Sequence, residues 1–172
     1  MSSIRILKSD ITILETDAIV NAANEGLWAG GGVCGAIFRA AGHAQLQEAC
    51  SKIGHCDTGS AVITPGFRLK AKYIIHAVGP VWHGGSYHEA DLLYSAYISS
   101  LNLAAEYGCT SIAFPLISAG IFGVPLEEAW RIALSACRDY QKNHPDQPMD
   151  ILFAILLDEI LEAGLAMLKK ED

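Results

Sequence analysis

The sequence has no long hydrophobic run. Its longest apolar stretch, Ile151 to Leu157, is far shorter than the roughly 20 residues that span a bilayer. The N-terminal segment carries Arg5, Lys8 and Asp10 and has no continuous apolar stretch, so it does not resemble a secretory signal. We therefore expect a cytoplasmic protein with no membrane partner, in which residues 151–157 form a buried strand.

The sequence also lacks the spacings of cysteine and histidine that are typical of metal sites. The five cysteines are odd in number and include no Cys-x-x-Cys pair, which argues against a disulfide framework and a structural zinc site. The six histidines show no His-Glu-x-x-His spacing, and we expect His55, beside Cys56, to lie on the surface rather than on zinc. The sequence thus predicts reduced thiols, no metal and no cofactor.

Positive charge is scarce, with 12 Lys and Arg against 19 Asp and Glu, a formal net charge of −7. Proteins that follow the phosphates of nucleic acid normally present a broad basic face, so we do not expect nucleic acid as a partner. An anionic ligand is still compatible with this charge where backbone amides bind it, because those amides do not enter the count.

No linker, repeat or low-complexity tract divides the 172 residues. A chain of this length, 51% hydrophobic, can bury one sizeable core. We expect a single domain over residues 1–172 that acts as a monomer.

Apolar runs and helical stripes predict an α/β fold. Six strands are expected at Ile4–Leu7, Ala18–Ala23, Ser60–Thr64, Tyr73–Val78, Ser111–Ile117 and Ile151–Leu157, several of them continuously apolar, as strands covered on both faces are. Four helices are expected: one from near Cys34 or Gly35, then Leu93–Ala104, Leu126–Tyr140 and Leu161–Leu168, the last with Asp158 as N-cap. Their alternation indicates a sheet with helices on both faces.

Three consecutive glycines follow one of the predicted strands. The segment runs from Asn21 and Asn24 through Gly30-Gly31-Gly32 to the start of a helix. Glycines let backbone N–H groups approach a ligand, and a helix start adds unpaired donors and the positive end of the helix dipole. The segment predicts an anion site made of backbone amides. The alternative is a tight turn whose glycines only serve packing.

The glycine spacing also matches a dinucleotide fingerprint. Gly30-x-Gly32-x-x-Gly35 is followed by Asp57 about twenty residues later. The Rossmann turn, however, places its first glycine at the end of the strand, whereas residues 24–29 intervene here. A dinucleotide-dependent oxidoreductase is kept as a distant alternative. A P-loop is excluded, because no Gly-Lys-Ser/Thr follows the glycines.

A second glycine-rich segment follows another predicted strand and again leads into a helix. It reads Phe-Pro-Leu-Ile-Ser-Ala-Gly-Ile-Phe-Gly-Val-Pro over residues 114–125. Ligands of open α/β sheets lie beyond the carboxyl ends of strands, so the two amide-rich loops can face each other and hold a diphosphate. Phe122, between two glycines, is expected either to pack on the ligand or to fold into the core.

Six motifs in order resemble those of the macrodomain family, specifically its MacroD type. They are Asp-Ile-Thr from Asp10, Asp-Ala-Ile-Val-Asn-Ala-Ala-Asn over 17–24, the triple glycine, Gly-Ser-Ala-Val-Ile-Thr over 59–64, Ile-His-Ala-Val-Gly-Pro over 75–80 and Phe-Pro-Leu-Ile-Ser-Ala-Gly-Ile-Phe-Gly over 114–123. The match covers almost the entire chain. It implies a three-layer α/β/α fold around a central mixed, largely parallel sheet, with a cleft for ADP-ribose.

The resemblance also implies roles for single residues. It places Asp10 on the adenine amino group and Ile11 beside the ring, and it places Asn24 on the distal ribose. The diphosphate would lie between two sets of backbone amides, those of Gly31, Gly32 and Val33 and those of Ser118, Ala119, Gly120, Ile121 and Phe122. These roles agree with ordinary chemistry, because a carboxylate accepts from an amine and loop N–H groups suit phosphate.

Two residues depart from the family pattern. Hydrolytic members of the MacroD type usually carry aspartate at the position of Cys34, and a neutral thiol does not accept a proton as a carboxylate does. Related viral macrodomains have a small residue there and are regarded as hydrolases. Leu157 stands where the family often has an aromatic ring that stacks on adenine, and losing that stack costs about 1 kcal/mol of affinity.

The resemblance thus implies binding of ADP-ribose or ADP-ribosylated protein. The expected activity is hydrolysis of ADP-ribosyl esters, on mono-ADP-ribosylated protein or in O-acetyl-ADP-ribose, with Asn24 as the catalytic residue. A non-catalytic reader of ADP-ribose is the alternative, because Cys34 replaces the aspartate. A thiol at a helix N-terminus can act as a nucleophile, but the sequence places no base beside Cys34, so we expect this thiol to be inert.

Overall fold

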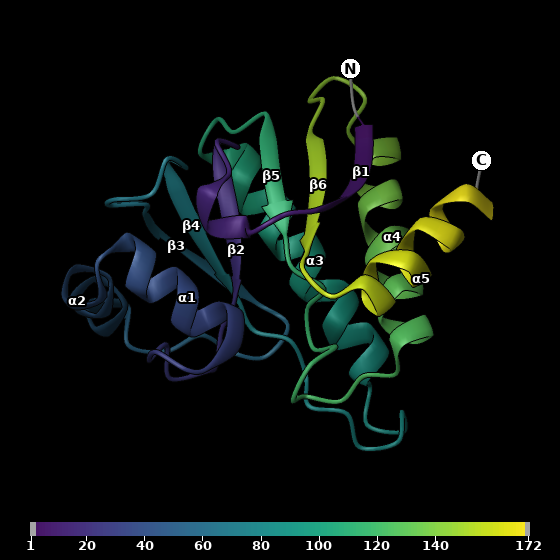
Figure 1. Ribbon diagram of the computed structural model, residues 1–172, viewed down its shortest axis with the longest axis horizontal. Coiled ribbons are helices and arrows are strands. Elements are labelled where there is room, and N and C mark those ends of the chain that lie inside the picture. Colours follow the sequence, from purple (N-terminus) through teal and green to yellow (C-terminus); the bar gives the residue numbers. More distant parts are fainter. Residues whose placement is uncertain (1–2, 171–172) are drawn as a thin grey trace.

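The computed structural model describes residues 3–170, which form a sheet of six strands flanked by five helices (Figure 1). The strands are β1 (Ser3–Lys8), β2 (Ala18–Ala22), β3 (Ala61–Pro65), β4 (Tyr73–Ala77), β5 (Ser111–Phe114) and β6 (Asp150–Ile155). Their order across the sheet is β1-β6-β5-β2-β4-β3, and only β3 runs antiparallel to its neighbour, β4.

All six predicted strands are present, with small shifts at their ends. The central strands β2, β5 and β6 are buried along most of their length, which explains their continuous apolar runs. β5 ends at Phe114 and β6 at Ile155, so the predicted ends at residues 117 and 157 were too late. Pro115 has no N–H to donate to a strand ladder, which accounts for the end of β5.

The helices are α1 (Gly32–Ala41), α2 (His43–Ile53), α3 (Glu89–Glu106), α4 (Leu126–Asn143) and α5 (Asp158–Lys170), and a single 3₁₀ turn spans Ile11–Ile13. The prediction of four helices was wrong, because Gly42, with φ at 108°, separates α1 from α2. α1 begins at Gly32, ahead of the predicted Cys34 or Gly35. Asp158 is the first residue of α5 rather than its N-cap.

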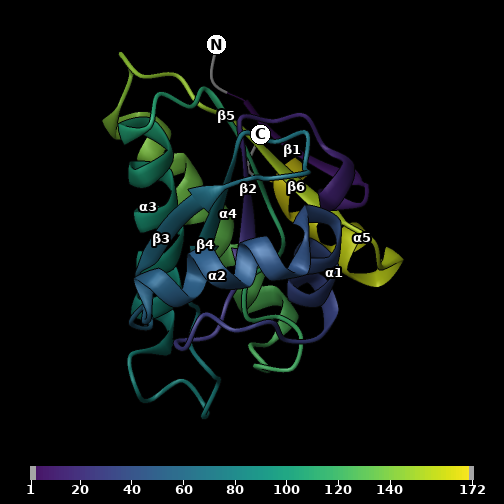
Figure 2. The ribbon, with the colours of Figure 1, turned by 90° about the vertical axis from the view of Figure 1, so that its left-hand side faces the viewer.

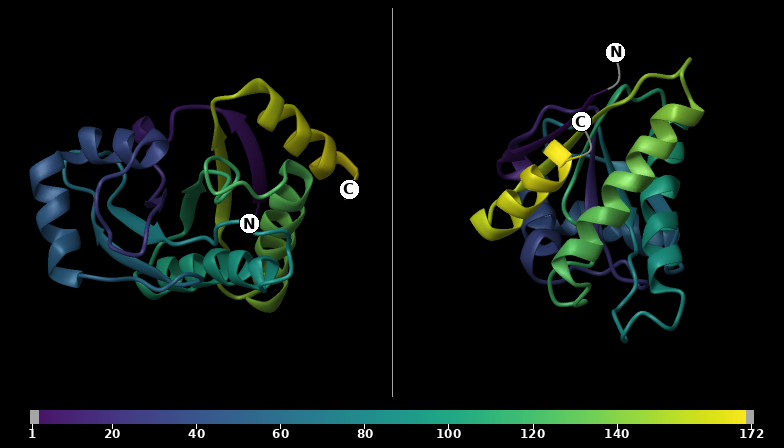
Figure 3. Two further views of the ribbon diagram at one scale, coloured as in Figure 1. Left: turned by 90° about the horizontal axis from the view of Figure 1, so that it is seen from below. Right: turned by 90° about the vertical axis from the view of Figure 1, so that its right-hand side faces the viewer.

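The helices cover both faces of the sheet and complete the expected three layers. α3 and α4 pack on one face, over a core in which Trp130, Tyr97, Phe114 and Phe153 are fully buried and in ring contact. α1 and α2 pack on the other face over a smaller apolar core. α5 lies on the side of α1 and contacts β1, β6 and α4 (Figures 2 and 3).

The five parallel strands all end at the same edge of the sheet, the lower edge in Figure 1. The loops that follow β1, β2, β5 and β6 meet at this edge, where α1, α4 and α5 begin. Ligands of open α/β sheets bind in this position. None of the helices between residues 3 and 170 combines the length and hydrophobicity that a bilayer crossing requires.

Candidate functional site

Two cavities lined by neighbouring residues lie beyond the carboxyl ends of the parallel strands, and we treat them as the two ends of one cleft. Its smaller end, about 200 Å³, is lined by Ala22, Ala23, Asn24, Gly30, Gly31, Cys34, Ser118, Ile121 and Phe122. Its larger end, about 380 Å³, is lined by residues that include Asp10, Ile11, Gly32, Val33, Ala119, Gly120 and Leu157. We call these the Asn24 end and the Asp10 end. The first glycine loop (residues 23–31) with the start of α1, and the second glycine loop (residues 115–125), bound both ends.

The first glycine loop delivers the start of α1 to the cleft. Gly31 is the N-cap, Gly32 has φ at 56°, and the Gly35 N–H makes a helical bond to the Gly31 carbonyl at 3.3 Å. The N–H groups that precede Gly35 in α1 therefore have no helical acceptor. A Cβ at Gly31 or Gly32 would meet no atom within 4 Å, so open space surrounds both. These amides and the helix dipole suit an anion.

Gly35 has a different function from the glycines before it. A Cβ there would lie 2.7 Å from the Gly30 carbonyl oxygen, so this glycine lets the loop pack against the helix. The tight-turn interpretation therefore applies to Gly35, whereas Gly31 and Gly32 are not required by packing against their neighbours.

The second glycine loop turns back on itself opposite α1. The Val124 N–H donates to the Ser118 carbonyl and the Gly123 N–H to the Gly120 carbonyl, both at 3.0 Å. Ser118 is buried and has φ at 64°. A Cβ added at Gly79 would lie only 2.2 Å from the Ser118 hydroxyl oxygen. Gly120 is exposed, and a Cβ there would meet no atom within 4 Å. The loop conformation thus depends on Gly79, while Gly120 faces open space.

At the Asp10 end, one carboxylate lies beside an apolar compartment. The Asp10 Oδ1 accepts from the Thr12 N–H at 2.9 Å and from the Thr12 hydroxyl at 2.7 Å, which caps the 3₁₀ turn. The second oxygen takes no part in these bonds and retains its capacity as an acceptor. Ile11 is buried beside it, and Leu157 is 65% exposed on the same cavity.

At the Asn24 end, the Asn24 amide is held by the backbone of Trp28. Its Nδ2 donates to the Trp28 carbonyl at 2.9 Å and its Oδ1 accepts from the Trp28 N–H at 3.2 Å. Leu27 has φ at 60°, and the Trp28 ring covers Gly26, where a Cβ would lie 1.7 Å from the ring. Each polar atom of Asn24 keeps one more hydrogen-bonding site. The side chain is therefore fixed in orientation yet can still bind a hydroxyl.

Cys34 lies at the same end, 7% exposed. The Gly30 N–H donates to its Sγ at 3.4 Å, and the Trp28 carbonyl oxygen is 4.0 Å from the sulfur. Among the described residues, no carboxylate and no imidazole lines this end of the cleft. The thiol thus has packing and backbone partners but no base beside it.

Phe122 and Ile121 form the opposite side of the Asn24 end. Phe122 is half-buried and lines the cavity rather than entering the core, and Ile121 is 98% exposed. Of the two arrangements expected for Phe122, the structure shows the one in which the ring remains available to a ligand.

Asn21 on β2 and His76 on β4 form a buried polar pair beneath the cleft. The Nδ1 of His76 is 3.0 Å from the Asn21 Nδ2, and its Nε2 is 3.0 Å from the Thr64 hydroxyl. Burial lowers the pKa of His76 to about 4, so the ring is neutral at pH 7. The neutral ring can accept from the Asn21 amide, which holds the strand that leads into the first glycine loop.

Three exposed side chains at this edge of the sheet could share a metal ion. Ligand atoms of Glu25, His55 and Asp57 lie within 4.8 Å of one another. His55 Nε2 is already 2.8 Å from Asp57 Oδ1, and Glu25 accepts from the Thr58 N–H and hydroxyl. His55 is on the surface as expected. No sequence motif indicates this cluster, because Glu25 is thirty residues from His55.

The structure brings together all the predicted site residues, from Asp10 to Leu157, around this one cleft. The sequence interpretation gave no individual role to several lining residues, which are Ser9, Ala22, Ala23, Ala36, Pro115, Leu116, Ala154, Ile155, Leu156 and Ile160. Most are small or apolar residues at strand ends, where composition resembles that of the core. Most of them lie within the last residues of the predicted strands, and that position was the available signal.

The fold and the cleft define a class of protein. It is an α/β protein whose sheet edge carries two glycine loops with open space at Gly31, Gly32 and Gly120, an apolar compartment at one end and an amide side chain at the other. Residues 20–133 match the model of the family described as Macro domain. The chain belongs to the macrodomain family.

Relatives and solved structures agree with this membership. The chain is 57% identical over 136 residues to a macro domain-containing protein of Chlorobaculum tepidum, covering 79% of this chain and 78% of that one. It is 49% identical over 152 residues to a Citrobacter rodentium protein named O-acetyl-ADP-ribose deacetylase, covering 85% of each.

Among solved structures, the Oceanobacillus iheyensis macrodomain with ADP has a TM-score of 0.92 and 35% identity, covering 99% of this chain and 92% of that one. The Trypanosoma brucei macrodomain in complex with ADP-ribose has a TM-score of 0.89 and 38% identity, covering 96% of this chain and 68% of that one.

Proposed function

We propose that the protein binds ADP-ribose in this cleft and hydrolyses ADP-ribosyl esters, on mono-ADP-ribosylated protein or in O-acetyl-ADP-ribose. The observation that carries the proposal is the pair of glycine loops, whose open glycines face one cleft with Asp10 at one end and Asn24 at the other. Similar macrodomains solved with ADP and with ADP-ribose, and a relative named O-acetyl-ADP-ribose deacetylase, support it.

In the proposed complex each part of the ligand meets matching chemistry. The adenine lies at the Asp10 end, where Asp10 Oδ2 accepts from the exocyclic amine and Ile11 contacts the ring. The diphosphate lies between the start of α1 and the second glycine loop, where backbone N–H groups donate to its oxygens. The distal ribose lies at the Asn24 end, where the free N–H and lone pair of Asn24 bind its hydroxyls.

Hydrolysis adds water across the ester and gives free ADP-ribose and the free carboxylic acid. Since no carboxylate or imidazole among the described residues lines the Asn24 end, the proton of the attacking water is best accepted by the phosphate of the substrate itself. Asn24 would orient the reacting ribose, and Cys34 would serve packing only. Catalysis of this kind lacks the positioned base that typically contributes about 10²–10⁴-fold, so we expect slow turnover.

A non-catalytic reader of ADP-ribose is the second candidate. The specific observation in its favour is Cys34, whose sulfur is bonded to the Gly30 N–H and takes the place where a base would be needed. A nicotinamide-dinucleotide oxidoreductase is disfavoured, because residues 23–31 separate β2 from α1 and the strand order differs from the Rossmann order 3-2-1-4-5-6.

Titration calorimetry with ADP-ribose and NAD tests the binding proposal. We expect 1:1 binding of ADP-ribose and much weaker binding of NAD, because the nicotinamide would need space beside the distal ribose that Phe122 and Gly31 bound. Gly120→Glu should abolish binding without unfolding the protein, since its side chain starts in open space and would project where the ligand lies. Equal affinity for NAD, or full affinity in a folded Gly120→Glu variant, would overturn the proposal.

A release assay then separates the hydrolase from the reader. Wild-type protein is incubated with aspartyl- or glutamyl-linked ADP-ribosyl protein and with O-acetyl-ADP-ribose, and free ADP-ribose is measured. Release above the spontaneous rate supports hydrolysis. Binding without release supports the reader.

A further inference from the structure

Glu89, at the start of α3, is a buried carboxylate that is only 2% exposed. It accepts three backbone hydrogen bonds from the loop before it: Oε2 from the His83 N–H at 2.8 Å and the Gly85 N–H at 2.9 Å, and Oε1 from the Tyr87 N–H. Burial by itself would raise the pKa of this carboxyl, but the backbone bonds lower it to about 2. The ionised carboxylate therefore organises residues 83–87.

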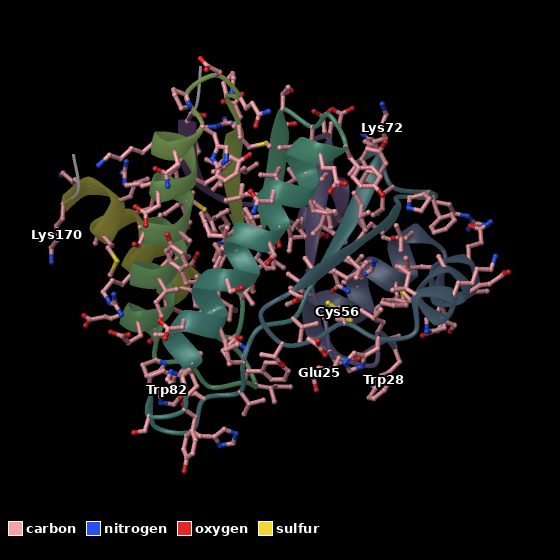
Figure 4. All side chains as sticks on the ribbon, turned by 180° about the vertical axis from the view of Figure 1, so that it is seen from behind. Glu25, Trp28, Cys56, Lys72, Trp82 and Lys170 are labelled. Carbon is pink, nitrogen blue, oxygen red and sulfur yellow. The ribbon has the colours of Figure 1, made fainter. Side chains whose placement is uncertain are left out.

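Trp82 connects this organised loop to the cleft. The backbone N–H of Trp82 donates to the Phe122 carbonyl at 2.7 Å. A Cβ added at Gly123 would lie 3.9 Å from the Trp82 Cβ. Gly85 has φ at 91°, and a Cβ there would lie 2.9 Å from the Trp82 ring. In Figure 4, Trp82 lies at the same edge of the sheet as Trp28. The contacts thus run from Glu89 through residues 83–87 and Trp82 to the second glycine loop.

We propose that Glu89 is a positioning residue for the Asn24 end of the cleft, which fixes Phe122 against the distal ribose through Trp82. This inference rests on the proposed function and assigns a residue that does not touch the ligand. A simple helix cap would bond to amides of its own helix, whereas Glu89 also holds three amides of the preceding loop. Loss of these three hydrogen bonds should make Trp82 and the Phe122 side of the cleft more mobile and leave the Asp10 end unchanged.

The expected signature is therefore a change in selectivity between two ligands. ADP contains the adenosine and the diphosphate but not the distal ribose, so it does not reach the Asn24 end. In Glu89→Gln, one carboxylate oxygen becomes an NH₂ group that cannot accept, and at least one loop bond is lost. We expect ADP-ribose affinity to fall about 10-fold, because only about a tenth of the variant then holds Phe122 in the binding geometry, while ADP affinity changes less than about 2-fold.

Two further variants accompany this measurement. Glu128→Gln is the matched control: Glu128 also lies in the first turn of an 18-residue helix, α4, and its carboxylate pairs with Arg131 on the surface. It should leave both affinities unchanged. Gly85→Ala disturbs the same loop while keeping the Glu89 carboxylate itself, because the new Cβ meets the Trp82 ring and the φ of 91° strains an alanine. It should reproduce the loss of selectivity, and it replaces Glu89→Gln if that variant does not fold.

Amide hydrogen exchange of the free protein tests the coupling without any ligand. Glu89→Gln should speed exchange both in residues 82–88 and in residues 118–124. Faster exchange confined to residues 82–88, or equal losses of ADP and ADP-ribose affinity, would overturn the inference. If wild-type protein binds neither ligand, the proposed function fails, and the exchange pattern alone decides whether Glu89 holds the second glycine loop.

Discussion

At the scale of single residues, the proposed catalysis depends most on position 34. Cys34 is the third residue of α1, is 7% exposed and accepts a hydrogen bond from the Gly30 N–H. A carboxylate there would keep that bond and would be favoured by the positive end of the helix dipole. We therefore expect the helix start to tolerate a charged base, and the proposal assigns the thiol no chemical step.

Substitutions at Cys34 and Asn24 test this assignment by release of ADP-ribose. Cys34→Asp should raise turnover by up to about 10²–10⁴-fold, because it restores a proton acceptor near the ribose. Asn24→Ala should lower turnover, because it removes the group that orients the ribose. Cys34→Ala should change little, and calorimetry should show that all three variants still bind ADP-ribose.

Two results would contradict these expectations. Loss of activity in Cys34→Ala and after thiol alkylation, with binding retained, would make the thiol a nucleophile. Absence of release from wild type together with measurable binding would identify a reader.

At the scale of secondary-structure elements, the position of α5 limits the Asp10 end. Leu157, just before α5, and Ile160, in its first turn, line that cavity. The Ile160 carbonyl accepts from the Trp130 indole N–H at 2.9 Å. Gly164 is the residue of α5 that lies against Trp130, where a Cβ would be 2.5 Å from the ring. The absence of a side chain therefore allows α5 to approach α4.

Gly164→Ala should destabilise the protein by about 1–3 kcal/mol, because overpacking against the fully buried Trp130 outweighs the better helix propensity of alanine. ADP-ribose affinity should fall as well, since α5 carries part of the Asp10 end. Urea unfolding and calorimetry measure the two effects.

The exposed Ala166, on the same helix, supplies the control. Ala166→Gly should lose about 1 kcal/mol through helix propensity alone and should not change binding. A more stable Gly164→Ala variant would show that α5 can shift without loss and that Gly164 does not set its position.

At the scale of the whole molecule, one buried histidine joins the strand that leads into the cleft to the rest of the sheet. His76 on β4 bonds to Asn21 on β2, and its other nitrogen lies beside Thr64 on β3 and the Cys50 sulfur on α2. Burial depresses its pKa from 6.5 to about 4, so the folded protein resists protonation that the unfolded chain accepts.

The free energy of unfolding should therefore fall as the pH drops from about 6.5 to about 4. In this window the unfolded chain binds a proton at His76 that the folded protein does not bind. The free energy of unfolding is therefore lowered by about 3 kcal/mol at about pH 4. Urea titrations at several pH values measure it. His76→Gln should remove this part of the pH dependence, whereas His43→Gln, at an exposed histidine, should retain it. An unchanged profile in His76→Gln would contradict the assignment.

Much of the fold and the site could be predicted from the sequence, because the relevant signals are local. Continuous apolar runs mark strands covered on both faces, so all six strands were found. Glycines that follow a strand and precede a helix mark loops at the carboxyl edge, and both glycine loops, Asp10, Asn24 and Leu157 line the cavities at that edge, while their ligand roles stay predictions. The break at Gly42 was missed, since a glycine between two helical stretches shows its positive φ only in the structure.

What the sequence by itself determined is the order of elements and the chemistry at each strand end, because apolar periodicity and glycine placement act over a few neighbouring residues. What only the tertiary structure decided is which distant residues meet: His76 with Asn21, Gly79 with Ser118, and Trp82 with Phe122. Those contacts depend on the strand order and on loop closure across tens of residues. Their energies come from burial and hydrogen-bond geometry, which no short stretch of sequence specifies.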